Sequence, residues 1–212
     1  MNISQGTAEK GGIYMKKLAL YMVLAICVVM LSSCKKEKVT IEIDKVEENT
    51  MLIQTGGGVQ VATVEEFNQD YYNIDELREF ITTIISKFNQ EVNNEAAIVL
   101  KELEQADGNA IMVLNYETME YYAQFNEVEA KYLPSISQED VEDFPDMLDS
   151  TGDDDYVFKD AVLEDEEYKA IILNEAYRVI LNGKVKYYTN STLIDSDEIH
   201  SGEGETSYII FK

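Results

Sequence analysis

The chain has 212 residues, and its 41 Asp and Glu against 17 Lys and Arg give a formal net charge of −24. This charge excludes nucleic-acid binding, which requires a basic surface. With two cysteines and one histidine, the sequence also excludes zinc sites built from several Cys and His side chains, and any Ser-His-Asp triad would have to use His200.

The first predicted element is a secretory signal over residues 15–33. Two lysines follow Met15, and the next 14 residues, 18–31, carry no charge. A helix of that length rises about 21 Å, which falls short of the ~30 Å hydrocarbon core of a membrane. A charged start, a short apolar run and small residues are typical of a signal sequence, and this length disfavours the alternative of a transmembrane helix. Residues 1–14 are polar, so we interpret them as an upstream extension and Met15 as the initiator.

The apolar run ends in Leu31-Ser32-Ser33-Cys34, which is an aliphatic residue and two small residues before a cysteine. This order resembles the lipobox of bacterial lipoproteins. In that family the thiol receives a diacylglyceryl group, and the chain is cut just before the cysteine. The resemblance implies that Cys34 is lipidated, becomes the first residue of the mature chain, and anchors the protein to the outer face of the cell membrane. The implied cut removes Cys27, three lysines and one glutamate, so the mature chain has a formal charge of −26 and no free thiol.

Residues 34–38 are the predicted lipidated cysteine and its linker to the folded part. From Cys34 to Val39 the chain reaches at most about 18 Å, so we expect the domain to lie close to the membrane. The folded part is predicted to comprise an α+β domain over 39–133, an acidic loop or short helix over 134–155, and a β-rich part over 156–212 that packs on the same domain.

The first folded segment is predicted to be all strand. Residues 40–46 alternate between apolar and polar, and residues 51–55 and 59–65 predict two further strands joined by Gly56-Gly57-Gly58. Three glycines could also cradle a phosphate, but that requires a helix to begin directly after them. Because a strand pattern follows instead, we predict a hairpin turn.

The longest predicted helix begins after Asn73, a favoured cap residue with Glu76 three positions on, and ends near Asn93-Asn94. Its apolar residues recur at helical spacing over four turns, which predicts a face turned to the core. These residues are Ile74, Leu77, Phe80, Ile81, Ile84, Ile85 and Phe88.

A hairpin and a short helix are predicted next. Residues 97–104 and 110–116 flank Asp107-Gly108, a pair that favours a tight turn. Residues 118–126 predict a short helix with Met119, Tyr122 and Phe125 turned inward.

Acidic residues dominate after Pro134, with 14 Asp and Glu and one lysine between residues 139 and 167. Ser137 is predicted to cap a short helix with Val141 and Phe144 inward, which Pro145 interrupts. Residues 149–155 predict a mobile loop. Strand patterns follow at 156–163, 168–173, 177–181, 184–189 and 207–211, and Asn182-Gly183 predicts a hairpin between the third and the fourth of them.

This order of elements predicts an α+β fold, mainly antiparallel β-sheet with one long amphipathic helix and one or two short helices. The regular alternation of strand and helix that marks a parallel sheet is missing. The stretches GKVKYY and YIIFK resemble uncharacterised lipoproteins of low-GC Gram-positive bacteria, a resemblance that implies no activity.

The acidic stretch contains a weak candidate for a calcium loop, formed by Asp149, Asp153, Asp155 and Asp160. Oxygen ligands at alternate positions suit calcium, and Asp160 is twelfth counted from Asp149. However, the sixth position, which needs glycine for a sharp turn, is Asp154, and an aspartate replaces the terminal glutamate. We therefore interpret the stretch as a solvated acidic loop and predict no metal or other cofactor.

Three pairs of adjacent tyrosines are candidates for sugar recognition: Tyr71-Tyr72, Tyr121-Tyr122 and Tyr187-Tyr188. Neighbours on a strand point to opposite faces, and neighbours on a helix diverge by ~100°. Each pair is therefore predicted to place one ring in the core and one at the surface.

His200 lies in the polar stretch 195–205 and is predicted to be a surface loop residue.

These features predict a lipid-anchored, non-enzymatic binding or envelope-assembly module outside the cytoplasm, with an envelope protein or a glycan as partner. One alternative is a hydrolase that uses carboxylates on cell-wall or glycan substrates, for which 40 acidic residues supply many accidental pairs. Another is a small solute receptor. A deep cleft with two facing carboxylates would favour the hydrolase, whereas a shallow surface with exposed tyrosines would favour binding.

Overall fold

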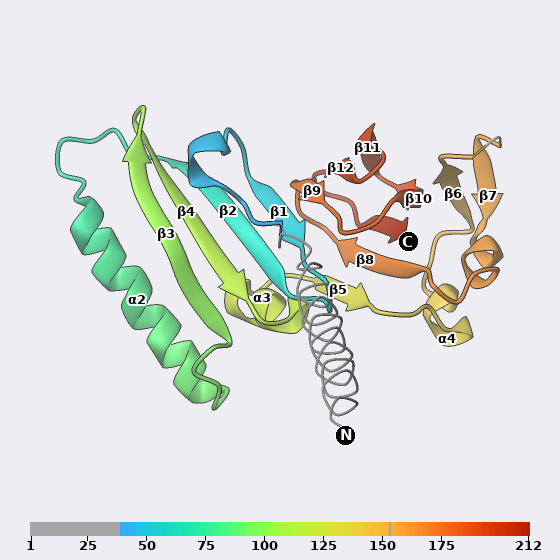
Figure 1. Cartoon of the computed structure of the whole chain (residues 1–212), viewed down its shortest axis with the longest axis horizontal. Coiled ribbons are helices and arrows are strands. Elements are labelled where there is room, and N and C mark those ends of the chain that lie inside the picture. The colour runs from blue at the N-terminus through green and yellow to red at the C-terminus, as the bar shows by residue number, and fades with distance from the viewer. Residues whose placement is uncertain (1–38, 153) are drawn as a thin grey trace, which may run out of the picture. The chain divides into compact units, whose positions relative to one another are not determined.

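Two β-sheets and the helices that pack on them make up the fold (Figure 1). The computed structural model describes residues 39–152 and 154–212. The predicted signal, the lipobox with Cys34 and most of the linker lie outside these residues, as does Asp153. Residues 40–212 form one unit, and the mainly antiparallel α+β class predicted from the sequence is confirmed.

The first sheet has seven strands in the order β11-β12-β9-β1-β2-β4-β3. All neighbouring strands in it are antiparallel except β1 and β9, which are parallel. Its strands are β1 (Thr50–Ile53), β2 (Val59–Glu66), β3 (Ile98–Ala106), β4 (Asn109–Tyr116), β9 (Arg178–Ile180), β11 (Ser191–Asp195) and β12 (Glu198–Ser201).

The second sheet has six strands in the order β5-β8-β13-β10-β6-β7, all antiparallel to their neighbours. Its strands are β5 (Ala130–Leu133), β6 (Met147–Ser150), β7 (Tyr156–Phe158), β8 (Lys169–Leu173), β10 (Val185–Thr189) and β13 (Ser207–Phe211). The sequence patterns did not predict β5, β6, β11 or β12.

The long helix is α2 (Ile74–Glu91), and Asn73 caps it by accepting hydrogen bonds from the backbone N–H of Asp75 and Glu76. Its predicted inner face is confirmed for Ile81 and Ile85, which are buried. The prediction is wrong for Phe80, which is exposed. Phe80 directly precedes Ile81, and one residue turns a helix by about 100°, so its side chain leaves the buried stripe.

Two of the three predicted glycine turns are confirmed. Gln54 and Gly58 pair across the β1–β2 turn, where the N–H of Gln54 donates to the carbonyl of Gly58 over 2.8 Å. Gly57 has a φ of +87°, which favours glycine. A side chain there would also stand 2.6 Å from the ring of Tyr132, so both the backbone and the available space require glycine. In the β3–β4 turn, Asp107 and Gly108 both have positive φ, as a tight hairpin demands.

The short helices are also confirmed. Thr118 caps α3 (Met119–Asn126), in which Met119 and Tyr122 are buried. Ser137 caps α4 (Gln138–Glu142), and its backbone N–H in turn donates to the carboxylate of Asp140.

The predicted hairpin at Asn182-Gly183 is wrong, because the turn carries the chain from one sheet to the other. β9 already lies between β1 and β12, whereas β10 lies between β13 and β6. The backbone of Lys184 exchanges two hydrogen bonds with Lys212, the last residue of the chain. A side chain at Gly183 would stand 2.8 Å from the carbonyl oxygen of Lys212. Glycine at this position therefore allows the two backbones to approach closely and does not form a hairpin turn.

In two of the segments predicted as strands, the structure has a turn of 3-10 helix. Residues 40–46 contain η1 (Ile43–Lys45) instead of a strand, because Ile43 packs on Ala62 and Val113 and covers a face of the first sheet. The strand pattern at 156–163 ends at Phe158, where η2 (Lys159–Leu163) begins. Asp149 and Ser150, predicted to lie in a mobile loop, belong to β6 and pair with both β7 and β10.

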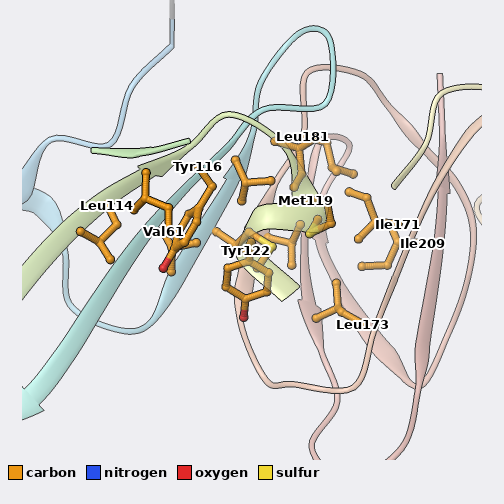
Figure 2. Packing of buried hydrophobic residues seen from close by; sticks show 14 of the residues in the cluster. Val61, Leu114, Tyr116, Met119, Tyr122, Ile171, Leu173, Leu181 and Ile209 are labelled. Atoms are coloured by element: carbon orange, nitrogen blue, oxygen red, sulfur yellow. The ribbon is translucent and has the colours of Figure 1, made fainter. Parts of the chain in front are cut away.

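The largest core lies between the two sheets and is completed by α3 (Figure 2). Val61 and Leu114 come from the first sheet, and Ile171 and Ile209 come from the second. Met119 of α3 packs in the same cluster. A smaller cluster around Val141, Phe144 and Leu148 contains Ala170 and Ile210, the sequence neighbours of Ile171 and Ile209 on β8 and β13, so the second sheet is buried on both faces.

Candidate functional site

An open groove of about 910 Å³ runs between α2 and β3, the edge strand of the first sheet. Apolar Ile85, Ile98 and Val99 and the polar side chains of Thr82, Ser86 and Gln90 contribute to its lining. Arg78 and Glu95 also line it, so both signs of charge are present.

Two side chains of α2 form hydrogen bonds with backbone groups of β3. The amide of Asn89 donates to the carbonyl of Ile98 over 2.9 Å and accepts the N–H of the same residue over 3.0 Å. Arg78 donates to the carbonyl of Leu103 over 2.6 Å. An exposed edge strand is a template for further pairing, and these contacts occupy it at both ends of the groove. The sequence signal for Asn89 is a polar residue at helical spacing from Ile81 and Ile85 within a buried stripe.

A second surface is the aromatic ledge, which we define as Phe67, Tyr71 and Tyr72 in the loop between β2 and α2. Phe67 and Tyr72 stack with ring centroids 4.7 Å apart, and Tyr71 meets Tyr72 edge to face at 4.9 Å. Tyr71 is 77% exposed and Tyr72 is 43% exposed. The prediction that one ring of each tyrosine pair lies in the core is therefore wrong for this pair, because the loop is neither helix nor strand and the rules for those elements do not apply.

The other two tyrosine pairs behave differently. Tyr122 is buried, while Tyr121 is partly buried against Phe88. Tyr187 and Tyr188 are both partly buried and contact different core clusters. The prediction that one of these two rings lies at the surface is therefore wrong.

Tyr116 of β4, Tyr122 of α3 and the partly buried Tyr177 form what we call the buried tyrosine cluster; Figure 2 shows Tyr116 and Tyr122. The hydroxyl of Tyr122 donates to the carboxylate of Glu175 and lies 3.2 Å from the hydroxyl of Tyr177. Burial raises the pKa of all three phenols above the usual value of about 10, so they stay protonated donors into the alkaline range. Perturbed groups of this kind can mark an active site, but Tyr122 is only 1% exposed and is packed among core side chains. We interpret the cluster as structural.

The calcium candidates are distributed over three elements. Asp149 is in β6, Asp155 lies in the turn that follows, and Asp160 is in η2, while Asp153 is outside the described residues. Within residues 39–152 and 154–212, no three or more His, Cys, Asp or Glu side chains are grouped so as to hold a metal ion.

A shallow depression of about 590 Å³ contains two carboxylates, those of Asp149 and Glu205. Thr189, Asn190 and Tyr208 also line it. Asp149 belongs to β6 and Glu205 to the loop before β13, so the two acids approach from separate segments. This depression is where the hydrolase alternative would place its chemistry.

His200 lies in β12 and not in a loop, so that prediction is corrected. Its Nε2 is 3.4 Å from a carboxylate oxygen of Glu48, and the side chain is partly exposed. Its partners across the ladder are Thr192 of β11, which is exposed, and Arg178 of β9.

Across the residues that the structure describes, no helix combines the length and apolar character needed to cross a bilayer. The chain matches no protein-family model, and it matches neither a curated protein nor a solved structure.

Proposed function

We propose that the chain is a lipoprotein, anchored through Cys34 to the outer face of the cell membrane, whose folded part is a binding module. The observation that carries this proposal is the order of a charged start, 14 uncharged residues and Leu31-Ser32-Ser33-Cys34. Two acyl chains on Cys34 would bury on the order of 30 methylene groups at ~0.8 kcal/mol each, which makes anchoring stable.

The way the folded part begins supports a short tether. The buried side chain of Gln60 accepts hydrogen bonds from the hydroxyl of Thr40, over 3.0 Å, and from the N–H of Ile41. Its amide nitrogen donates to Asn115 over 2.8 Å, so β2 and β4 both take part in holding the start of the domain. Thr40 is the sixth residue after Cys34, and a tether of that length keeps the domain within roughly 20 Å of its anchor.

Two surface features favour binding over catalysis. The aromatic ledge and the groove beside β3 are open surfaces with mixed polar and apolar linings, as binding sites commonly are. Tyr122, a phenol with a strongly raised pKa, lies in the core instead of in a cleft. A solute receptor would enclose its ligand, whereas the groove lies along the outer edge of one sheet.

A hydrolase remains the second candidate because Asp149 and Glu205 share one depression. It predicts that the purified chain releases reducing ends from cell-wall or other glycans and that Asp149→Asn and Glu205→Gln each abolish the release. The binding proposal expects no release from any of the three proteins.

The test of the anchor is mass spectrometry of the native N-terminus together with cell fractionation. We expect Cys34 as the first residue with its lipid attached, and we expect Cys34→Ala to be shed or to persist as an uncut precursor. An unmodified native chain that retains residues 15–33, or a Cys34→Ala protein that is cut normally and still fractionates with membranes, would show that the proposal is wrong.

A further inference from the structure

We propose that the aromatic ledge binds a neutral pyranose glycan, with one sugar ring stacked on Tyr71 and its hydroxyl groups bonded to the polar side chains beside it. This inference names the ligand of the binding module. It rests on the proposed function, which places the module on the outer face of the cell membrane, where it would meet the glycan.

The ring of Tyr71 is available for stacking. It is 77% exposed, while its contact with Tyr72 is edge to face, with an interplanar angle of 74°. Tyr72 in turn stacks on Phe67, so the three rings form one aromatic surface and are not scattered single exposures. A pyranose presents a face of C–H groups that suits the negative face of an aromatic ring.

The loop that carries the ledge is held in place before any ligand binds. The N–H of Phe67 donates to the carbonyl of Gly108 over 2.7 Å, and Gln105 donates to the carbonyl of Phe67 over 3.1 Å. Both partners belong to the β3–β4 hairpin, and Asn73 fixes the other end of the loop as the cap of α2. Preorganised rings lose little conformational entropy on binding.

Polar groups beside the rings match the hydroxyl rim of a sugar. The amide of Asn68 donates to Glu66 over 2.7 Å, and the amide of Gln69 donates to Asn68 over 2.8 Å. All three side chains are exposed and present planar donor and acceptor groups at the surface. A ligand with an apolar face and a polar edge can satisfy both parts of this surface.

The charge around the ledge narrows the class of glycan. Residues 65–77 contain five acidic residues and no Lys or Arg. Acidic glycans and anionic lipid surfaces would be repelled, which favours neutral sugars over acidic ones. A protein partner is also disfavoured, because hot spots of protein interfaces lie within dry apolar surroundings, and here the sequence neighbours Glu66, Asn68 and Asp70 are exposed polar residues.

The experiment is titration calorimetry of the full chain, purified in detergent, with chitohexaose, cellohexaose and maltohexaose, and with polygalacturonate as the acidic comparison. We expect saturable binding of at least one neutral oligosaccharide and none of polygalacturonate. Saturation-transfer NMR should show the strongest transfer to the C–H protons of the sugar. Tyr71→Ala should weaken binding by about tenfold, the size of one aromatic contact, whereas Tyr71→Phe should retain it.

Tyr156→Ala is the matched control, because Tyr156 is similarly exposed, at 60%, but lies on β7 in the other sheet. It should bind as the unaltered chain does. The inference is overturned if no neutral oligosaccharide binds, if Tyr71→Ala and Tyr156→Ala weaken binding equally, or if Tyr71→Ala instead removes a protein that co-purifies with the native chain. None of these outcomes affects the fractionation of Cys34→Ala, so a failure of the ledge and a failure of the anchor are told apart.

Discussion

Tyrosines gather in two contrasting regions of this protein, the aromatic ledge and the buried tyrosine cluster. In the ledge, Tyr71 and Tyr72 stand in a loop and expose their rings to solvent. In the cluster, Tyr122 is placed by α3 against Tyr116 of β4, with ring centroids 5.3 Å apart and perpendicular planes. Both regions use edge-to-face aromatic contacts, but only the ledge leaves ring surface for a ligand.

The contrast shows how the supporting element determines what a tyrosine does. A helix or strand turns successive side chains to different sides, so Tyr121 and Tyr122 are separated in burial. A loop imposes no such period, and both members of Tyr71-Tyr72 remain at the surface. We therefore expect the cluster to contribute stability, and the proposal assigns binding to the ledge, a division that can be tested residue by residue.

Tyr122→Ala should have the largest effect on stability. The side chain is almost fully buried between the sheets, and removing a buried aromatic ring costs about 4 kcal/mol in free energy of unfolding. Urea denaturation measures this loss. Under conditions where the variant is folded, its affinity for the oligosaccharide should be unchanged, and a stability loss below about 1 kcal/mol would contradict the structural role of the cluster.

Alkaline pH should have the next largest effect, because it removes the stability contributed by the buried tyrosine cluster. The pKa of Tyr116, Tyr122 and Tyr177 is raised in the folded state, so the stability they contribute is fully present below the unfolded-state pKa of about 10. It is lost as the pH rises from there toward the folded-state values, by about 1.4 kcal/mol per phenol for each pH unit. Tyrosinate absorbance followed together with circular dichroism should show these phenols ionising only as the fold is lost. Ionisation of every tyrosine of the mature chain before any unfolding would refute this.

Much of the fold follows from local signals in the sequence. The cap at Asn73, the glycine turn at residues 56–58 and the Asp107-Gly108 turn each act within a few residues, and all three are confirmed. Asn182-Gly183 looks the same locally, but its outcome depends on Lys212, about 30 residues further along the chain. No local pattern reports which sheet receives the next strand, so the predicted hairpin was wrong.

The candidate site was predictable only in part. The pair Tyr71-Tyr72 is visible in the sequence, but its exposure depends on where β2 ends and α2 begins. Phe67 gives no signal, because its role arises from the fold of the loop that brings its ring against Tyr72. Asn89 could have been noticed as a polar residue in an apolar stripe, although its partner Ile98 is known only once β3 is placed.

Tyr122→Phe removes a hydroxyl and keeps the ring, so it isolates the polar part of the cluster. Glu175 loses a donor and Tyr177 loses a neighbouring hydroxyl, while the aromatic packing remains. Glu175 is partly exposed and can turn toward water, which limits the cost to about 1 kcal/mol. Comparison with Tyr122→Ala by urea denaturation divides the stability between ring and hydroxyl. A cost equal to that of Tyr122→Ala would mean that the ring itself contributes nothing.

Tyr71→Ala should have the smallest effect on stability, within about 0.5 kcal/mol of the unaltered chain. The ring is mostly solvated, and the main-chain bonds of Phe67 and the cap at Asn73 hold the loop without it. Tyr72→Ala provides an internal scale, because it also removes the stacking contact with Phe67 and should cost about 1 kcal/mol. Urea denaturation of both variants beside the binding titration decides the matter: a ledge built for a ligand loses affinity at nearly constant stability. If Tyr71→Ala lost stability as Tyr122→Ala does, the ring would be part of the core and the contrast between the two regions would be wrong.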